Sequence, residues 1–304
     1  MIAVFGASGF LGSAIANSAA ESGLEMHAVV RKTSKTNRIN PESGAEIISL
    51  EEASWEEYIS QNHPETVISA MWSGVAPSYR EDYSTQFKNV NQTLFLANIC
   101  KKNRVANFIA FGSQAEVPES ADKIMEIEYE YFGNSYSQAK RKLRYELQLL
   151  FENADTRFCW ARTFSIYGPG DSPKALIPSI YRAASTNTTF HLQEPGRRWS
   201  ALHVDDFVSA VRSIIWKSGI KGVINIGNPN SCSIQELAHE AEHILKVKFP
   251  DWEGICYEHH VELEGRIPST VKLAQQGWSP RVTLQIGIES TFKWLSTNYP
   301  ELKE

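Results

Sequence analysis

A tyrosine and a lysine stand four residues apart in the segment NSYSQAKRK, as Tyr136 and Lys140. In a helix this spacing places both side chains on one face. A phenol with an ordinary pKa of about 10 carries protons poorly at neutral pH, and a neighbouring ammonium moves that pKa toward the working range by favouring the phenolate. The pair therefore suits proton transfer, and the ammonium can also hold a cofactor ribose. Two unrelated surface neighbours would show the same spacing, so the pair alone leaves both interpretations open.

A serine, Ser113, lies just past the apolar run 107–111 and 23 residues before Tyr136. If that run is a strand of a parallel sheet, Ser113 reaches the carboxyl edge of the sheet, where loop residues lie over a bound nicotinamide. Its hydroxyl can there hydrogen-bond a substrate carbonyl. Because Gly112 and Ser113 also form a turn-like pair, a simple turn cap is the alternative. Together with the glycine loop described next, these residues predict the catalytic set Ser113, Tyr136 and Lys140.

A glycine-rich loop, GASGFLG, follows the first apolar run directly and precedes a helical pattern. Glycine is needed where the backbone turns tightly, where it approaches a pyrophosphate and where helix and strand pack closely, and the helix start offers free N–H groups to the anion. Glycines also make ordinary strand-to-helix turns, but this context favours dinucleotide binding. The loop residues expected to contact the cofactor are Gly6, Ser8, Gly9, Phe10, Leu11 and Gly12.

Positive charge marks the end of the second expected strand, at residues 31–35 (RKTSK). An NAD enzyme usually has an acidic residue there to bind the ribose 2′-hydroxyl, whereas a basic side chain suits a 2′-phosphate. We therefore expect Arg31 to contact the cofactor and favour NADP, with NAD still possible. The alternative is a solvated basic loop that contacts nothing.

The elements that would position these residues alternate between short β-branched runs and longer helical patterns, which predicts βαβ units and a parallel sheet. The fold class is thus α/β, a Rossmann-type doubly wound parallel sheet with a smaller C-terminal α/β substrate-binding lobe. We place the dinucleotide-binding domain at residues 1–162 and the substrate lobe mainly at 163–304, with 204–230 returning to the first domain. Expected strands are 2–5, 26–31, 46–50, 66–71, 107–111, 157–161 and 222–226. Expected helices follow Gly9 and cover 79–102, 135–151, 204–217, 233–245 and 284–295.

The composition and charge of the chain argue against some classes of binding partner. The 304 residues carry a net charge of −5 with no long run of Lys or Arg, which argues against nucleic acid and an anionic membrane. The opening MIAVFGASGF lacks the pattern of a signal peptide and no run is long enough to span a bilayer, so we expect a cytoplasmic protein. We expect reduced thiols at Cys100, Cys159, Cys232 and Cys256 and no metal site, because the pair His259 and His260 has no ligand at a recognisable spacing.

When its motifs are taken together, the sequence resembles the extended short-chain dehydrogenase/reductase family of sugar-nucleotide epimerases, dehydratases and ketoreductases. Besides GxxGxxG and YxxxK, the similarity includes Asn89 in NVNQTLFLANI, YGPGD at 167–171, HVDD at 203–206 and GWSP at 277–280. The resemblance implies a Rossmann domain that binds the dinucleotide, with Asn89 among its contacts, and a C-terminal lobe that binds a nucleoside diphosphate sugar. It also implies a homodimer built on the two long helices.

Several positions depart from the family pattern. Gln114 and Ala115 replace the acidic pair that family dehydratases carry after the active-site hydroxyl residue, which argues against a 4,6-dehydratase. Ser165 stands where many epimerases have an asparagine, and Ala70 and Trp72 replace the usual histidine-containing turn. We expect Trp72, Ser113 and Ser165 to contact the substrate and Ala70 to lie beside the nicotinamide. In the segment GRRWSALHVDD, the guanidinium of Arg198 is expected to bind the diphosphate, whose geometry it matches. A core aromatic at Trp72 and a salt-bridged loop arginine at Arg197 or Arg198 are the alternatives.

The combined prediction is an NAD(P)H-dependent reduction of a 4-keto nucleoside diphosphate deoxysugar, with Tyr136 as the proton donor. The basic residues at 31–35 and the loss of asparagine at position 165 favour a reductase. A nucleotide-sugar 4-epimerase that retains NAD would use the same residues and is the nearest alternative. A non-catalytic regulator that senses the dinucleotide is the alternative of another class, although such a protein has no need of an intact Ser, Tyr and Lys set.

Overall fold

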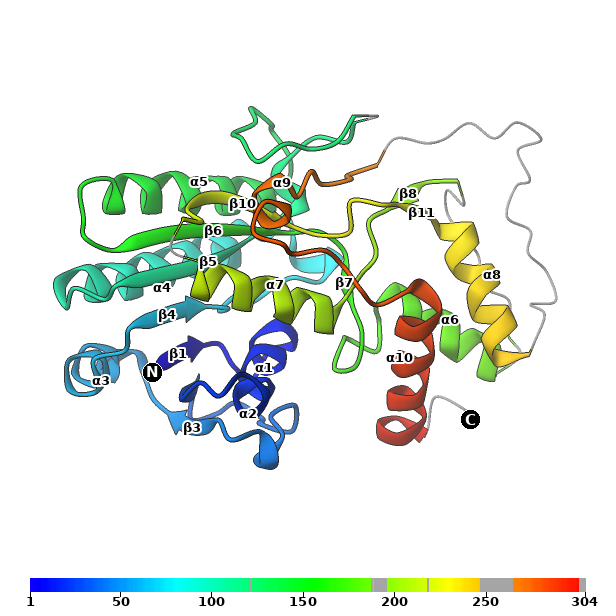
Figure 1. The fold of residues 1–304 in the computed structure, drawn as a ribbon, viewed down its shortest axis with the longest axis horizontal. Helices are drawn as coiled ribbons and strands as arrows, with labels where there is room; N and C mark the ends of the chain where they lie inside the picture. The colour runs from blue at the N-terminus through cyan, green and yellow to red at the C-terminus, as the bar shows by residue number, and fades with distance from the viewer. Residues whose placement is uncertain (121, 187, 189–195, 218, 247–264, 301–304) are drawn as a thin grey trace.

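Seven parallel strands form the central sheet of the computed structural model, which describes residues 1–120, 122–186, 188, 196–217, 219–246 and 265–300 (Figure 1). Their order is β10-β6-β5-β4-β1-β2-β3, so the strand order reverses between β1 and β4 and opens a crevice at the carboxyl ends. The strands are β1 (Ile2–Phe5), β2 (Met26–Val30), β3 (Glu46–Ser49), β4 (Thr66–Ser69), β5 (Asn107–Ser113), β6 (Arg157–Thr163) and β10 (Gly222–Ile226). The predicted doubly wound α/β fold is confirmed.

Helices cover both faces of the sheet, because successive residues of its buried strands face opposite sides. One core joins Val4 and Ile109 to the apolar faces of α1 (Phe10–Asn17), α7 (Val204–Trp216) and α9 (Val271–Ala274). The other core joins Phe5 and Phe108 to α3 (Trp55–Asn62), α4 (Tyr83–Lys102) and α5 (Ser135–Phe151). The sheet is therefore a rigid platform whose carboxyl edge can hold side chains in fixed positions.

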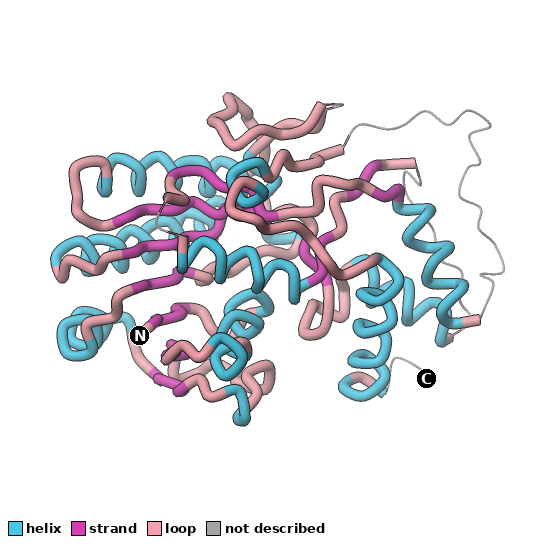
Figure 2. The backbone as a smooth tube through the Cα atoms, in the orientation of Figure 1, coloured by secondary structure: helices cyan, strands magenta, loops and turns pink. Residues whose placement is uncertain are grey.

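A third, smaller core lies beside the carboxyl edge of the sheet, where three helices pack on one another (Figure 2). Ile180, Leu237 and Phe292 form its centre, each almost fully buried. The helices are α6 (Leu176–Ser185), α8 (Ile234–Leu245) and α10 (Leu284–Asn298). Short strand pairs lead into this region: β7 (Ile166–Tyr167) with β9 (Leu202–His203), and β8 (Arg198–Trp199) with β11 (Cys232–Ser233).

Two of the family-like motifs fasten the later part of the chain to the sheet. The carboxylate of Asp206, in HVDD, accepts hydrogen bonds from the backbone N–H groups of Arg281 and Val282 at 2.9–3.0 Å. The indole of Trp278, in GWSP, donates to Ser209 Oγ on α7 at 2.8 Å. These motifs therefore hold α7 against the segment that leads into α10.

The predicted elements match those observed, with shifted ends. The helix predicted over 79–102 begins at Tyr83, because a 3₁₀ turn, η3 (Pro77–Tyr79), precedes it and Asp82 caps it by accepting from Thr85 N. The strand predicted over 107–111 continues to Ser113, which pairs with Thr163 of β6. The remaining short elements are α2 (Ala19–Ser22), η1 (Pro41–Ser43), η2 (Glu52–Ser54) and η4 (Gln114–Glu116). The segment 222–226 joins the sheet as β10, while the domain boundary at residue 162 stays a prediction.

Within the described ranges, no helix is both long and apolar enough to cross a bilayer. The same ranges hold no group of three or more His, Cys, Asp or Glu side chains that could bind a metal ion. His259, His260 and Cys256 lie outside the described residues, so the expectations for them stay predictions.

Candidate active site

The three residues predicted to be catalytic meet at the carboxyl end of β5. Ser113 is the last residue of that strand, and Tyr136 lies in the first turn of α5, which begins at Ser135 with Asn134 as its cap. The Ser113 side chain lies close enough to the Tyr136 hydroxyl to lower its pKa. Lys140, one turn further along α5, donates from Nζ to the carbonyl oxygen of Phe111 in β5 at 2.7 Å. Strand and helix thus bring together residues that are 27 positions apart in the chain.

The phenol of Tyr136 is buried, with 8% of the residue exposed. Burial raises the pKa of Tyr136 above its ordinary value, while the Ser113 side chain and the positive charge of Arg80 act in the opposite direction. The edge of Trp72 meets the tyrosine ring with centroids 5.9 Å apart. The hydroxyl is therefore held neutral beside Ser113, as a proton donor should be.

Lys140 occupies a pocket between the helix and the sheet. Its Nζ lies 3.5 Å from the centroid of a Trp72 ring and 6.0 Å from the Tyr136 ring. Burial lowers the pKa of Lys140 to about 7, and the negative charge of Glu116 partly offsets this. The lysine therefore titrates near neutral pH, so its charge depends on what binds beside it.

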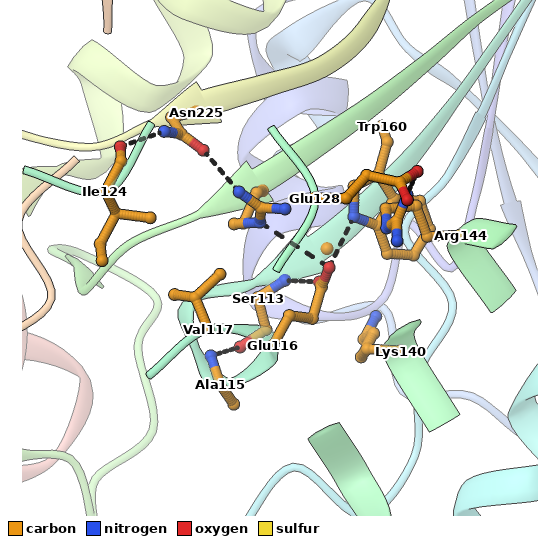
Figure 3. A network of polar contacts seen from close by, with 12 residues as sticks. Ser113, Ala115, Glu116, Val117, Ile124, Glu128, Lys140, Arg144, Trp160 and Asn225 are labelled. Carbon is orange, nitrogen blue, oxygen red and sulfur yellow. Dashed lines mark hydrogen bonds and ion pairs between the residues drawn. The ribbon is translucent and has the colours of Figure 1, made fainter. Parts of the chain in front are cut away.

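Beside Ser113 lies a buried carboxylate, Glu116, which sequence reasoning did not identify (Figure 3). Its Oε1 accepts from the backbone N–H of Ser113 at 2.6 Å and its Oε2 from the Trp160 indole at 2.9 Å. Arg162 Nε lies 3.8 Å from Oε2, and both side chains are 1% exposed. The serine also caps η4 by accepting from Ala115 N at 3.2 Å, completing a capping box with Glu116. Glu116 therefore fixes the backbone that carries the Ser113 hydroxyl.

A second residue missed from the sequence, Gln114, joins Ser113 to the other side of the site. Ser165 Oγ donates to Gln114 Oε1 at 3.2 Å, and Ser165 adopts a left-handed backbone conformation with φ of 43°. Non-glycine residues avoid this region unless the surrounding structure enforces it, and such residues cluster at functional sites. This placement agrees with the expectation that Ser165 faces the substrate, which stays a prediction.

The glycine loop has the shape expected of a dinucleotide cradle. Gly6 has φ of +83°, and a Cβ there would come within 2.8 Å of backbone atoms of Ala70 and Met71. A Cβ at Gly12 would lie 2.4 Å from Gly6 O, whereas Gly9 has room. Gly9 caps α1 without a side-chain hydrogen bond, and the first turn carries no acidic residue. The N–H groups of this helix start are therefore suited to an anion, which is what a pyrophosphate requires.

A cavity of about 210 Å³ lies at this loop and reaches Trp72, whose ring contacts Tyr136 and Lys140. The predicted cofactor residues that line it are Gly6, Ser8, Gly9, Arg31, Ala70 and Asn89, and Trp72 lines it as well. Asn89 also pins the loop after β4, because its amide bonds Ser73 N and Ser73 O at 2.9 Å each. The cavity walls fit a dinucleotide whose phosphates lie at Gly9, although the individual contacts stay predictions.

The other predicted residues are placed as follows. Phe10 and Leu11 form the start of α1, and the Phe10 ring faces Gly170 of the YGPGD motif. Trp72 donates from Nε1 to Gln86 Oε1 at 2.9 Å. Arg198 lies in β8 and donates from Nε to Ser231 Oγ at 2.6 Å, and Arg197 forms an ion pair with Glu119. Both arginines thus have protein partners, and the diphosphate contact expected for Arg198 stays a prediction.

A larger hollow, of about 800 Å³, lies between α5, β6 and β10. Its lining includes Glu126, Glu128, Arg144 and Arg157 but none of the residues predicted to act on substrate or cofactor. Because the catalytic groups converge elsewhere, the smaller cavity is the better candidate for the cofactor.

Comparison with known proteins gives a consistent result. A model of the NAD dependent epimerase/dehydratase family matches residues 2–227. A dTDP-D-glucose 4,6-dehydratase from mouse is 24% identical over 233 residues, which cover 74% of this chain and 66% of the mouse enzyme, so the match spans just under two thirds of that relative.

Solved structures resemble the whole chain. UDP-glucose 4-epimerase from Thermotoga maritima, solved with UDP-glucose, superposes with a TM-score of 0.82 at 22% identity and covers 97% of this chain and 98% of its own. UDP-glucuronic acid 4-epimerase from Bacillus cereus, solved with NAD, gives 0.84 at 18% identity and covers 98% of this chain and 97% of its own. At these identities the superpositions establish the fold.

Proposed function

The chain belongs to the NAD-dependent epimerase/dehydratase family, and from that premise we propose that it reduces a 4-keto nucleoside diphosphate sugar, using NADPH. The observation that carries the proposal is the meeting of Ser113, at the end of β5, with the buried Tyr136 and Lys140 of α5, beside the Trp72 ring that lines the cofactor cavity. A carbonyl oxygen is a group that both hydroxyls can bind at once.

Each residue has a role in this reaction. When bound, the reduced nicotinamide supplies the hydride. Ser113 Oγ and Tyr136 Oη would hold the keto oxygen, and Tyr136 would give it a proton as the carbonyl becomes an alcohol. Lys140 would bind the cofactor ribose and, when protonated, favour the phenolate that Tyr136 leaves behind. Glu116 would keep the Ser113 backbone in place through its 2.6 Å hydrogen bond.

The cofactor choice rests on the end of β2. Arg31 and Ser34 line the cavity, and neither carries the negative charge that would select against a 2′-phosphate. NADPH, which is released after each turnover, suits a reductase. This supports the reductase over an enzyme that keeps its cofactor.

A 4-epimerase that retains NAD is the second candidate, and the comparisons favour it. The structures from Thermotoga maritima and Bacillus cereus are both 4-epimerases, and the second contains NAD. Such an enzyme would use Tyr136 first as a base and then as an acid at the same oxygen.

We also propose a homodimer through α4 and α5, whose apolar side chains Phe95, Tyr145 and Leu149 are about half exposed. We further propose a cytoplasmic location.

The test begins with the purified protein. Its absorbance and any nucleotide released on denaturation show whether a dinucleotide is retained, and fluorescence titration compares NADPH with NADH. We expect reversible binding with NADPH the tighter ligand, followed by NADPH oxidation in the presence of 4-keto nucleoside diphosphate sugars and no turnover by Tyr136→Phe. Tightly retained NAD and interconversion of 4-hydroxy sugar nucleotides would replace the reductase with the epimerase, and full activity of Tyr136→Phe would refute both.

A further inference from the structure

One arginine outside the predicted site, Arg80, is held against Tyr136 at both its backbone and its side chain. The carbonyl oxygen of Arg80 accepts from Tyr136 N at 2.8 Å, at the start of α5. Its Nε donates to Val75 O at 3.0 Å within the loop between β4 and α4. The side chain therefore has a defined position even though it is only half buried.

The guanidinium of Arg80 lies over the tyrosine. Its Cζ is 5.5 Å from the centroid of the Tyr136 ring. Among the residues that the structure describes, no carboxylate lies within ion-pair distance of Arg80. Its charge is therefore not neutralised by those residues.

The other groups around Tyr136 supply less positive charge. Lys140 is 6.0 Å from the ring and donates to Phe111 O, and burial lowers its pKa to about 7, so the lysine is not fully protonated at neutral pH. Glu116, on η4, carries a negative charge that opposes ionisation of the phenol. Ser113, on β5, contributes a neutral hydroxyl. Arg80, on the loop before α4, is the permanent cation in this set.

We propose that Arg80 is a positioning residue that stabilises the phenolate of Tyr136 and so makes the proton of its hydroxyl transferable. The inference rests on the proposed function. As the hydride adds to the carbonyl carbon, the C=O π pair moves onto oxygen and takes the proton from Tyr136 Oη. The O–H bond breaks and its electron pair stays on the phenolate beside the guanidinium of Arg80.

The first test does not need a substrate. All 11 tyrosines are replaced by fluorinated tyrosine, whose phenol is more acidic than that of tyrosine. ¹⁹F NMR then follows each resonance as the pH changes. The signal that is missing in the Tyr136→Phe variant is that of residue 136. Because the positive charge of Arg80 lowers the pKa of Tyr136, Arg80→Gln is expected to raise the pKa of residue 136 by about one unit. Arg80→Lys should retain most of the wild-type value. Arg104→Gln, which removes the same charge at the opposite end of β5, should leave it unchanged.

The second test uses activity. In Arg80→Gln the pH dependence of kcat should move in the same direction as the NMR titration, with cofactor affinity unchanged. An unchanged titration of residue 136 in Arg80→Gln overturns the inference, and so does a variant whose only change is a higher KM, since that would make Arg80 a substrate contact. If the wild type shows no reductase activity while the titration shifts as expected, the proposed function fails and the role of Arg80 stands.

Discussion

Replacing Lys140 with Met should make the protein more stable relative to the wild type as the pH falls. Lys140 is 5% exposed, and burial lowers its pKa to about 7. Lysine in an unfolded chain has a pKa of about 10.4. Between these two values the unfolded state binds a proton that the folded state does not, so protonation pulls the wild type toward unfolding. Methionine has a similar length, fills the space and cannot titrate.

The sign and size follow from linkage. The folded pKa is depressed, so the contribution of this lysine to stability is fully present above about pH 10.4 and is lost as the pH falls toward about 7. Each pH unit inside that window corresponds to about 1.4 kcal/mol. Allowing for the curvature at both ends, lowering the pH from about 9 to about 7 should cost the wild type about 2 kcal/mol through Lys140 alone. Lys140→Met escapes this cost.

Urea unfolding of the apo protein across that pH range measures the effect, as the difference between variant and wild type. The substitution also removes the hydrogen bond to Phe111 O, which adds a constant offset, so the pH slope of the difference carries the information. Lys142→Met is the matched control, because Lys142 is half exposed on the same helix and should give a difference that is flat with pH. A flat difference for Lys140→Met as well would refute the reasoning, since burial would then impose no penalty on the ammonium.

Three further perturbations test other parts of the site. Gly12→Ala should lower the free energy of unfolding by about 1–3 kcal/mol and abolish NADPH binding, because its Cβ would meet a backbone oxygen at 2.4 Å. Gly9→Ala, whose nearest contact would be at 3.4 Å, should keep the wild-type stability. Urea unfolding and fluorescence titration compare the two variants. Arg31→Glu should weaken NADPH about tenfold with little effect on NADH, and Lys35→Glu, which does not line the cavity, should change neither. Glu116→Gln should lose about 1–3 kcal/mol in urea unfolding, because its amide N–H group would face one of the two N–H donors that the carboxylate now accepts.

Most of the fold was predictable because burial leaves a strong pattern in the sequence. The strands β1 and β10 and the helix α5 match the predicted ranges at both ends. The helices α3 and α6 were not predicted, and the other errors lie at ends decided by local capping or by long-range pairing. The hydrogen bond from Thr85 N to Asp82 starts α4 later than its hydrophobic pattern indicates, and pairing with β6 carries β5 on to Ser113. Pairing of this kind depends on a strand far along the chain, which a local pattern does not contain.

The site was predictable only where spacing along one element fixes geometry. Tyr136 and Lys140 share a helix face, and this spacing became a usable signal only together with Ser113 and the glycine loop. Glu116, Gln114 and Arg80 come from short turns whose side-chain directions no periodicity describes. The one available signal was Glu116 three residues after Ser113, which is the spacing of a capping box. That pattern predicts a turn, and only the fold shows that Trp160 and Arg162 bury the carboxylate.

The buried carboxylate raises an electrostatic question, because a negative charge near Tyr136 opposes the ionisation on which proton transfer depends. Two N–H groups donate to the Glu116 carboxylate and Arg162 lies nearby. These fixed partners offset most of the buried negative charge, so the structure tolerates it. The negative charge of Glu116 favours the protonated form of Lys140, whereas burial favours the neutral form. Glu116 therefore favours the ammonium of Lys140 near neutral pH, while Arg80 lies over the Tyr136 ring. Neutral Lys140 alone could not offset a buried phenolate, so a site that buries its tyrosine and lysine this deeply requires charges from both neighbouring turns.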